Sequence, residues 1–212
     1  MLRYVYANDL YQYPQLAASM FRDRADQFKT RLGWEVSVDE HGFEKDQYDE
    51  LNPLYVIWEN ADGSHGGSMR FLPTTGRTMV NEHFSHVMGG GEVRSPLIWE
   101  CTRFCLSRTA SSRMAALLVV ACGEVMHHFN VEHFVGVFDA RMVRIYRMLG
   151  ASPDVLGRDG EGCDQISVGL WHYDAADRNK ILRRAGVSLA LSQLWFDRSF
   201  GADDAQDLAQ SA

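Results

Sequence analysis

The apolar and polar positions of the chain change period several times, and each period predicts a secondary-structure element. Short apolar or alternating runs bounded by turn residues predict strands, whereas apolar residues at helical spacing predict helices. The expected strands are 2–6, 54–58, 66–72, 97–106, 134–138 and 165–172. The expected helices are 9–31, 111–129, 140–149 and one more after residue 175.

The order of these elements predicts an α/β protein. A strand and a helix come first, several antiparallel strands follow, and helices then alternate with strands. This order predicts a three-layer α/β/α sandwich with a mixed, mostly antiparallel sheet and helices on both faces. We expect one domain over residues 1–200 and a disordered tail over 201–212. The polar stretch 33–52 has no clear period, and such a long loop in a compact domain is usually functional.

The composition is that of an ordinary globular protein. Of its 212 residues, 46% are hydrophobic and 23% are charged. No apolar run reaches the roughly 20 residues of a membrane span, and the first residues lack the apolar core of a secretory signal. We therefore expect a cytoplasmic protein without membrane contact, whose four cysteines are free thiols. The one histidine cluster, at 127, 128 and 133, has no cysteine or carboxylate at ligand spacing, so we expect no metal.

The charge of the chain is negative overall but unevenly distributed. A net charge of −7 argues against general nucleic-acid binding. Basic residues nevertheless gather between 141 and 184, and Arg141, Arg144 and Arg147 recur at helical spacing. A basic face on an acidic protein suits docking of a specific acidic partner. A solvated helix with scattered arginines is the simpler alternative.

Two groupings in the first 50 residues combine charges with aromatic rings. Arg24 and Phe28 lie one turn apart on the predicted helix, and Trp34 follows. An ordinary amphipathic helix would explain this pair as well. Three carboxylates then crowd the polar loop, and they repel unless a cation lies among them. They are Glu44, Asp46 and Asp49. A cationic ligand, an arginine such as Arg24 or Arg70, or plain solvation would each relieve this repulsion.

Two further groupings lie in predicted strands. Arg70 follows the glycine pair 66–67, and glycine inside a strand marks a bulge or a close approach of another group. In the strand 97–106, alternation predicts Glu100 and Thr102 on one face and Cys101 and Arg103 on the other. Polar side chains in an apolar strand need partners, or they serve a function.

Together these groupings resemble the LuxI-type acyl-homoserine lactone synthases from about residue 3 to about residue 172. The resemblance is specific because nine residues occur in the family's order and at its spacing. They are Arg24, Phe28, Trp34, Asp46, Asp49, Arg70, Phe84, Glu100 and Arg103. The segments Arg70-Phe71-Leu72-Pro73-Thr74 and 99–104 carry the best-marked motifs. The resemblance implies an acetyltransferase-like fold with a lid over about residues 9–52 that binds S-adenosylmethionine (SAM).

The resemblance also implies a two-substrate reaction for quorum sensing. The amine of SAM attacks an acyl thioester, and the carboxylate of SAM then closes the lactone and displaces methylthioadenosine. SAM is a substrate in this scheme, and no cofactor is expected. Glu100 is the candidate base, directly or through a water, with Thr102 beside it. Backbone N–H groups near Arg103 and Phe104 are candidate oxyanion donors.

The resemblance assigns the remaining candidates to SAM and to the acyl chain. Phe28 and Trp34 would form the wall of the SAM pocket, because aromatic faces suit a sulfonium cation. Asp46 and Asp49 would order the lid by pairing with an arginine, namely Arg24, Arg70 or Arg103. Residues expected at the acyl and pantetheine pocket are Met79, Phe84, Phe104, Leu118, Cys122 and Val137. No threonine stands at 137 or 138, which favours an unsubstituted or 3-hydroxy acyl chain.

The acyl donor is expected to be an acyl carrier protein, with acyl-coenzyme A as the alternative. The turn 108–113 before the long helix lacks the glycines that usually hold the pyrophosphate of coenzyme A. Arg141, Arg144 and Arg147 would suit an acidic carrier helix instead. Two other functions compete with this reading: an N-acyltransferase acting on another amine, and a non-catalytic SAM- or acyl-binding sensor. A DNA-binding regulator is not expected, because the sequence shows no basic helix-turn-helix segment.

Overall fold

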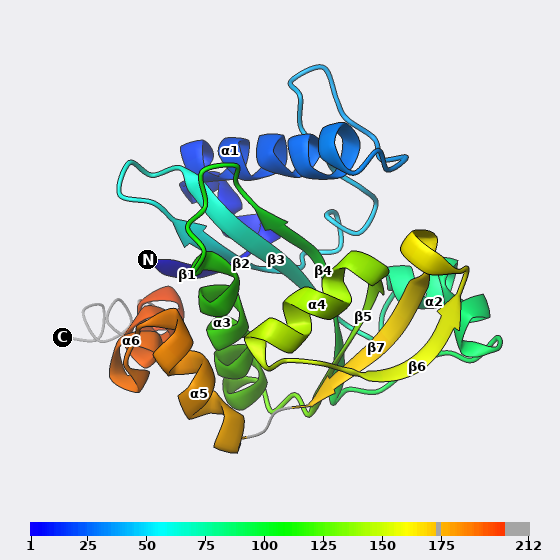
Figure 1. Cartoon of the computed structure of the whole chain (residues 1–212). Helices are drawn as coiled ribbons and strands as arrows, with labels where there is room; N and C mark the ends of the chain where they lie inside the picture. The colour runs from blue at the N-terminus through cyan, green and yellow to red at the C-terminus, as the bar shows by residue number, and fades with distance from the viewer. Residues whose placement is uncertain (173–174, 202–212) are drawn as a thin grey trace.

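A computed structural model describes residues 1–172 and 175–201, and the predicted tail from 202 lies outside the described residues (Figure 1). The strands are β1 (Leu2–Tyr6), β2 (Leu54–Glu59), β3 (His65–Pro73), β4 (Ile98–Leu106), β5 (His133–Asp139), β6 (Asp154–Asp159) and β7 (Ile166–His172). The α-helices are α1 (Pro14–Ala25), α2 (Met79–His83), α3 (Met114–His128), α4 (Ala140–Leu149), α5 (Ala175–Ala185) and α6 (Leu189–Phe200).

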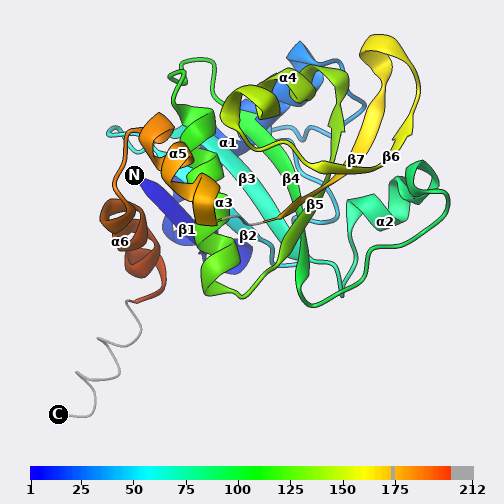
Figure 2. The ribbon, with the colours of Figure 1, turned by 60° about the horizontal axis from the view of Figure 1, so that its bottom comes forward.

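The strands form one mixed sheet in the order β1-β2-β3-β4-β5-β7-β6. Every neighbouring pair is antiparallel except β4 and β5, which run parallel. Helices α1 and α2 pack on one face, and α3 to α6 pack on the other (Figures 1 and 2). The predicted three-layer α/β/α sandwich with a mostly antiparallel sheet is therefore confirmed.

The first predicted helix is divided into three segments. A 3-10 helix (Ala7–Gln12) precedes α1, and a π-helix (Asp26–Arg31) continues it. Pro14 opens α1 because it has no N–H to leave unpaired at a first helical position. Helix α1 buries Leu16, Met20 and Phe21 against β2, which is the apolar spacing seen in the sequence. The wider π turn carries Phe28.

Three elements of the structure were not predicted from the sequence pattern. Strand β6 is an edge strand whose side chains are almost all exposed, so it shows no buried alternation. Helix α2 spans only 5 residues, too few to display a helical period. The tail contains two helices where one was predicted, because Gly186 at φ 65° ends α5 and the Ser188 hydroxyl accepts from Leu191 N at the start of α6.

Strands β4 and β5 pair only at their first residues and then separate. The paired residues are Ile98↔His133, Trp99↔Phe134 and Glu100↔Val135. Just before they separate, the two backbones are in tight contact, because a Cβ added at Gly136 would lie 2.8 Å from the Cys101 carbonyl oxygen. Beyond it, residues of both strands line a cavity. This opening connects the two faces of the sheet. None of the described helices has the length and apolar character that spanning a bilayer would require.

Candidate functional site

Arg24 on α1 is buried between two carboxylates of the segment 33–52. Its side chain is 1% exposed, and Nε donates to Glu44 Oε2 at 2.6 Å. Nη1 and Nη2 donate to the two oxygens of Asp49 at 3.0 and 2.9 Å, a bidentate geometry. Burial alone would raise the pKa of Asp49, but the charges of Arg24 and Arg70 outweigh burial and lower it.

Arg70 on β3 joins the same carboxylates to the sheet. Its guanidinium is fully buried and donates to Asp46 Oδ1 at 2.5 Å and to Asp49 Oδ1 at 2.8 Å. Its Nε donates to Thr102 Oγ1 at 3.1 Å, across the β3–β4 ladder. The Thr102 hydroxyl accepts this bond, which leaves its own proton for another acceptor. The predicted pairing of Asp46 and Asp49 with arginines is what the structure shows.

Arg103 reaches this cluster because β4 bulges. The β3–β4 register shifts between Ser68↔Cys105 and Arg70↔Thr102, and Arg103 takes a φ of 54°. Its Nη2 donates to Asp46 Oδ2 at 2.6 Å, and Nε donates to Glu44 Oε1 at 3.1 Å. The prediction that Arg103 faces away from Thr102 is therefore wrong, because the bulge breaks the alternation. We call Arg24, Arg70, Arg103, Glu44, Asp46 and Asp49 the clamp.

An aromatic pair lies beside the clamp. The rings of Phe28 and Trp34 stack with centroids 5.2 Å apart and an interplanar angle of 6°. Phe28 is 3% exposed and Trp34 is 42% exposed, so the outer ring is open to solvent. The Arg103 guanidinium lies 5.4 Å from the Phe28 centroid. A ligand cation would find ring faces and carboxylates together here.

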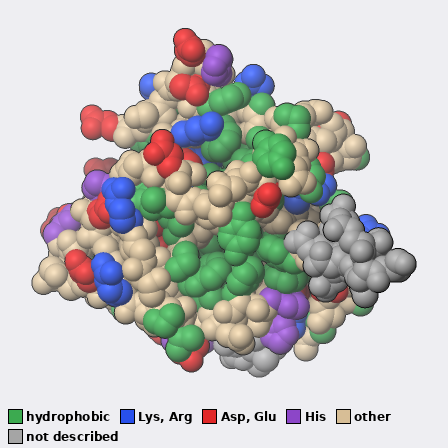
Figure 3. Space-filling view, turned by 180° about the vertical axis from the view of Figure 1, so that it is seen from behind, with side chains coloured by type: hydrophobic (Ala, Val, Ile, Leu, Met, Phe, Trp, Pro, Cys, Tyr) green, Lys and Arg blue, Asp and Glu red, His purple; other side chains and the backbone are tan. Residues whose placement is uncertain are grey.

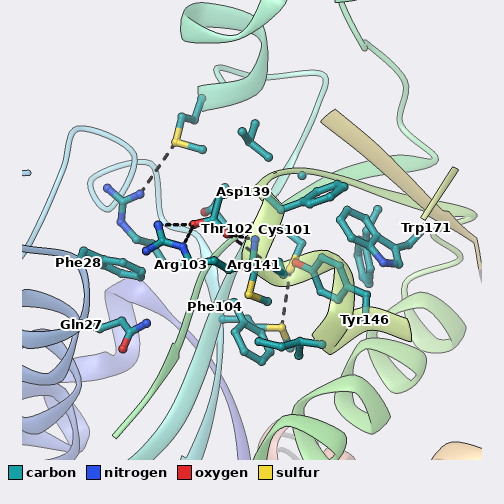
Figure 4. A pocket seen from close by; sticks show the side chains of 18 of the residues that line it. Gln27, Phe28, Cys101, Thr102, Arg103, Phe104, Asp139, Arg141, Tyr146 and Trp171 are labelled. Carbon is teal, nitrogen blue, oxygen red and sulfur yellow. Dashed lines mark hydrogen bonds and ion pairs between the residues drawn. The ribbon is translucent and has the colours of Figure 1, made fainter. Parts of the chain in front are cut away.

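One cavity of about 1030 Å³ links this pair to the opposite face of the sheet. It begins at the π-helix and the segment 33–52, passes through the opening between β4 and β5, and continues between α3 and α4. Figure 4 shows Phe28 and Gln27 at one side, Tyr146 and Trp171 at the other, and Thr102 and Arg103 between them. Its volume reaches the upper end of the usual range for one drug-sized ligand, and its two ends differ in character.

The cavity is lined by most of the residues predicted for an acyl chain, and we call its part between α3 and α4 the acyl arm. Those residues are Met79, Phe84, Phe104, Cys122 and Val137. Leu118 is the exception: it is fully buried in the main core and does not line the cavity. On helix α3, Val119 and Val120 line the cavity, whereas Leu118 packs in the main hydrophobic core.

Glu100 lies behind the wall of the cavity. Its carboxylate is 1% exposed and accepts from Met79 N at 3.1 Å and from Val80 N at 2.6 Å, the first residues of α2. Burial raises the pKa of Glu100 to about 7, although the two N–H groups and Arg70 oppose the rise. Glu100 does not line the cavity, so direct contact with a substrate amine there does not follow from this geometry.

The three arginines predicted for docking occupy one helix but differ in their surroundings. Arg141 lines the cavity and pairs with Asp139, which also caps α4. Arg144 and Arg147 are exposed. Arg147 also borders a second cavity, of about 500 Å³. The other basic residues there are Lys180, Arg183 and Arg184.

The site contains functional residues that the sequence reasoning did not assign. Glu44 was noted in the acidic grouping, but its full burial between Arg24 and Arg103 was not foreseen. Tyr55 donates its hydroxyl to Asp49 Oδ1 at 2.6 Å, and no local signal marked it. Among residues 1–172 and 175–201, no group of three or more His, Cys, Asp or Glu side chains could hold a metal ion.

Comparison with known proteins gives one consistent result. A profile of the autoinducer synthase family matches residues 9–183. An acyl-homoserine-lactone synthase from Rhizobium etli is 40% identical over 181 residues, which cover 82% of this chain and 84% of the relative. One from Pseudomonas fluorescens is 32% identical over 68% of this chain and 72% of the relative. In fold, the chain resembles BjaI, a coenzyme A-dependent acyl-homoserine lactone synthase solved with SAM and isopentyl-CoA, at a TM-score of 0.79 and 22% identity; the match covers 88% of this chain and 90% of BjaI.

Proposed function

The chain belongs to the autoinducer synthase family and is an acyl-homoserine-lactone synthase, and we propose that it joins an acyl group from an acyl carrier protein to the amine of SAM. The observation that carries this proposal is one continuous cavity whose two ends differ in chemical character. An aromatic pair and carboxylates suit the cationic substrate, and the acyl arm suits the chain. The opening between β4 and β5 is where the two would meet.

The reaction balances without a cofactor. The SAM amine, after losing a proton, attacks the thioester carbonyl; a C–N bond forms, the C–S bond breaks, and the carrier thiol leaves. A SAM carboxylate oxygen then attacks its own γ-carbon, and the C–S bond to the sulfonium breaks. The bonding electrons go to sulfur, and neutral methylthioadenosine leaves. Holding both substrates in one cavity makes the first step effectively unimolecular.

In this proposal the clamp holds the SAM-binding segment in position, and residues of β4 contact the reacting groups. The paired charges of Arg24, Arg70 and Asp49 hold the segment 33–52 over SAM. Thr102 lines the cavity with a hydroxyl proton to donate. Beyond Glu100 the described residues of β5 offer no ladder partner to β4, so its N–H groups near Arg103 and Phe104 suit the oxyanion.

Glu100 serves in the proposal as the base through a water. Its pKa of about 7 suits a base at neutral pH. Because its oxygens already accept two N–H bonds behind the cavity wall, a bridging water must carry the proton. The same bonds give Glu100 a second role, which is to hold α2 and thereby Met79 at the cavity.

Two basic segments favour the carrier protein as donor, because the arginines of one are bonded within the chain and those of the other are exposed. Ahead of α3, Arg113 donates to the Ala185 carbonyl and Arg108 pairs with Asp26, so both guanidiniums are engaged within the chain. On α4, Arg144 and Arg147 are exposed. On the face opposite the view of Figure 1, basic side chains are scattered among acidic ones (Figure 3). Coenzyme A is the second candidate, because BjaI is named as coenzyme A-dependent.

The acyl chain is proposed to be unsubstituted at its 3-position or to carry a 3-hydroxyl group. Val137 lines the cavity and Phe138 follows it, and neither provides a hydroxyl for a 3-oxo group.

The test is to incubate the purified protein with SAM and a panel of carrier-protein and coenzyme A thioesters, and to analyse products by mass spectrometry. We expect an acyl-homoserine lactone and an equal amount of methylthioadenosine, formed fastest from carrier donors. An acylated amine without methylthioadenosine would indicate an N-acyltransferase instead. Binding of SAM without turnover of any donor would indicate a sensor.

A further inference from the structure

The acyl arm reaches helix α5, on the face of the sheet opposite the aromatic pair. Its lining there includes Met126 of α3, Trp171 of β7, and Arg178 and Ile181 of α5. Arg178 and Ile181 are three residues apart, so they face the same side of the helix. Figures 1 and 2 place α5 and α1, which leads into Phe28, on opposite faces of the sheet.

A buried ion pair holds Arg178 at this end. Its Nη2 donates to Glu124 Oε1 at 2.8 Å, and the Arg178 side chain is 18% exposed. Glu124, on α3, is fully buried, and the same oxygen accepts from Ser192 Oγ of α6 at 2.6 Å. His128 Nε2 lies 3.5 Å from the other oxygen. Separating such a pair would leave a buried charge uncompensated, so the guanidinium is fixed in place.

Arg178 is also a charged residue among apolar lining residues of the acyl arm. The other Lys and Arg residues among the described residues that line the cavity lie at the SAM end or at the start of α4; they are Arg31, Lys45, Arg103 and Arg141. Three lining residues from α3, β7 and α5 at this end are apolar or aromatic, namely Met126, Trp171 and Ile181. Each methylene of an acyl chain gains about fourfold in affinity by entering such a wall. It gains nothing by displacing water from a charged pair.

We infer that Arg178, held by Glu124, ends the acyl arm and sets the longest acyl chain that the enzyme uses efficiently. This inference rests on the proposed function, because it takes the arm to hold the acyl chain. Chains that reach Arg178 fill the arm, and longer ones must bend back or desolvate the ion pair. Arg178 is thus a specificity-determining residue and takes no part in the bond changes.

The test variant replaces both charges, because removing one would strand the other. Arg178→Met with Glu124→Gln keeps the side-chain volumes, and the glutamine carbonyl still accepts from Ser192. Arg183→Met, an exposed change on the same helix, is the matched control. A series of saturated acyl donors differing by two carbons is ranked by kcat/KM for each protein, and folding is checked by circular dichroism.

We expect the double variant to favour the donor two carbons longer than the wild-type optimum, with a gain of about tenfold in its relative kcat/KM. The Arg183→Met control should not change the ranking. An unchanged ranking in the folded double variant would overturn the inference alone. No product from the wild type with any donor would overturn the proposed function, and this inference with it. If the double variant does not fold, Ile181→Phe tests the same end: it should abolish use of the longest donor, and an unchanged ranking would again overturn the inference.

Discussion

At the scale of single residues, the clamp is notable for how deeply its charges are buried. Arg24, Arg70 and Glu44 are at most 1% exposed. Buried ions are costly to desolvate, and each needs a partner with good geometry. The bidentate bond from Arg24 to Asp49 meets that need. The clamp therefore contributes a defined position for the segment 33–52 more than it contributes net stability.

Asp49→Asn should destabilise the fold by about 3–5 kcal/mol, because two buried guanidiniums lose their shared counter-charge. Urea denaturation followed by fluorescence measures the change. Asp26→Asn is the matched control, since the Asp26–Arg108 pair lies at the surface and should matter little. Equal losses in the two variants would contradict a structural role for the buried pair.

Glu100 should make stability depend on pH between about 4.5 and 7. Burial raises its pKa from 4.5 to about 7 in the folded state. The folded protein then binds more protons than the unfolded chain in this window, so the free energy of unfolding falls as pH rises, by about 3 kcal/mol, and is level above it. Glu100→Gln should lack this slope, whereas the exposed Glu40→Gln should keep it.

The same substitution tests the proposed chemistry. For the wild type, kcat/KM should rise with pH through about 7, because the base must be ionised. Glu100→Gln should lose this limb together with at least about a hundredfold in kcat. A variant that loses stability but keeps both the limb and kcat would leave Glu100 only the role of holding α2.

At the scale of elements, two local departures in β4 create the site. The bulge at Arg103 turns a side chain toward the clamp, and the separation from β5 opens the sheet. Neither departure is isolated. Both lie within the few residues that follow Glu100, so one strand carries Arg103 of the clamp, the Thr102 hydroxyl and the residues that have no ladder partner on β5.

Gly136→Ala should disturb this separation. The new methyl would lie 2.8 Å from the Cys101 carbonyl oxygen, and backbone on both sides resists a shift. We expect a loss of about 1–3 kcal/mol in the free energy of unfolding, with weaker binding of SAM or acyl donor in calorimetry. Gly76→Ala is the control: its methyl would have an ordinary contact at 3.7 Å, so stability should stay unchanged or rise slightly.

At the scale of the whole molecule, a net charge of −7 coexists with a basic helix beside the cavity. Overall repulsion from an acidic carrier is then overcome only where positive residues gather. Helix α4 exposes Arg144 and Arg147, while its Met142, Ile145 and Tyr146 line the cavity.

Reversing two of these charges should separate the donors. Arg144→Glu with Arg147→Glu should raise KM for carrier-protein donors by about tenfold and weaken the salt dependence, because association is steered by charge. KM for acyl-coenzyme A should change much less. Arg198→Glu, at an exposed position of α6, controls for a charge reversal away from α4. Equal effects on both donors would contradict carrier docking on α4.

Much of this architecture follows from local sequence. Apolar spacing determined the main strands and helices, and the order of the elements determined the sandwich. The charged and aromatic residues that form the site were recognised one by one. Elements without a buried period, such as β6 and the short α2, were missed because exposed or very short segments carry no such signal.

What the sequence by itself determined, then, was most of the residues that form the clamp or line the cavity. The tertiary structure decided how the residues are placed: Arg103 beside Asp46, Glu100 behind the cavity wall, Leu118 in the core, and Arg178 in the cavity lining. The physical reason is that a bulge, a strand separation and a buried ion pair each depend on contacts between segments far apart in the chain. Periodicity describes only neighbours along one segment, so it fixes the face of an ideal strand and not the point where the strand departs from it.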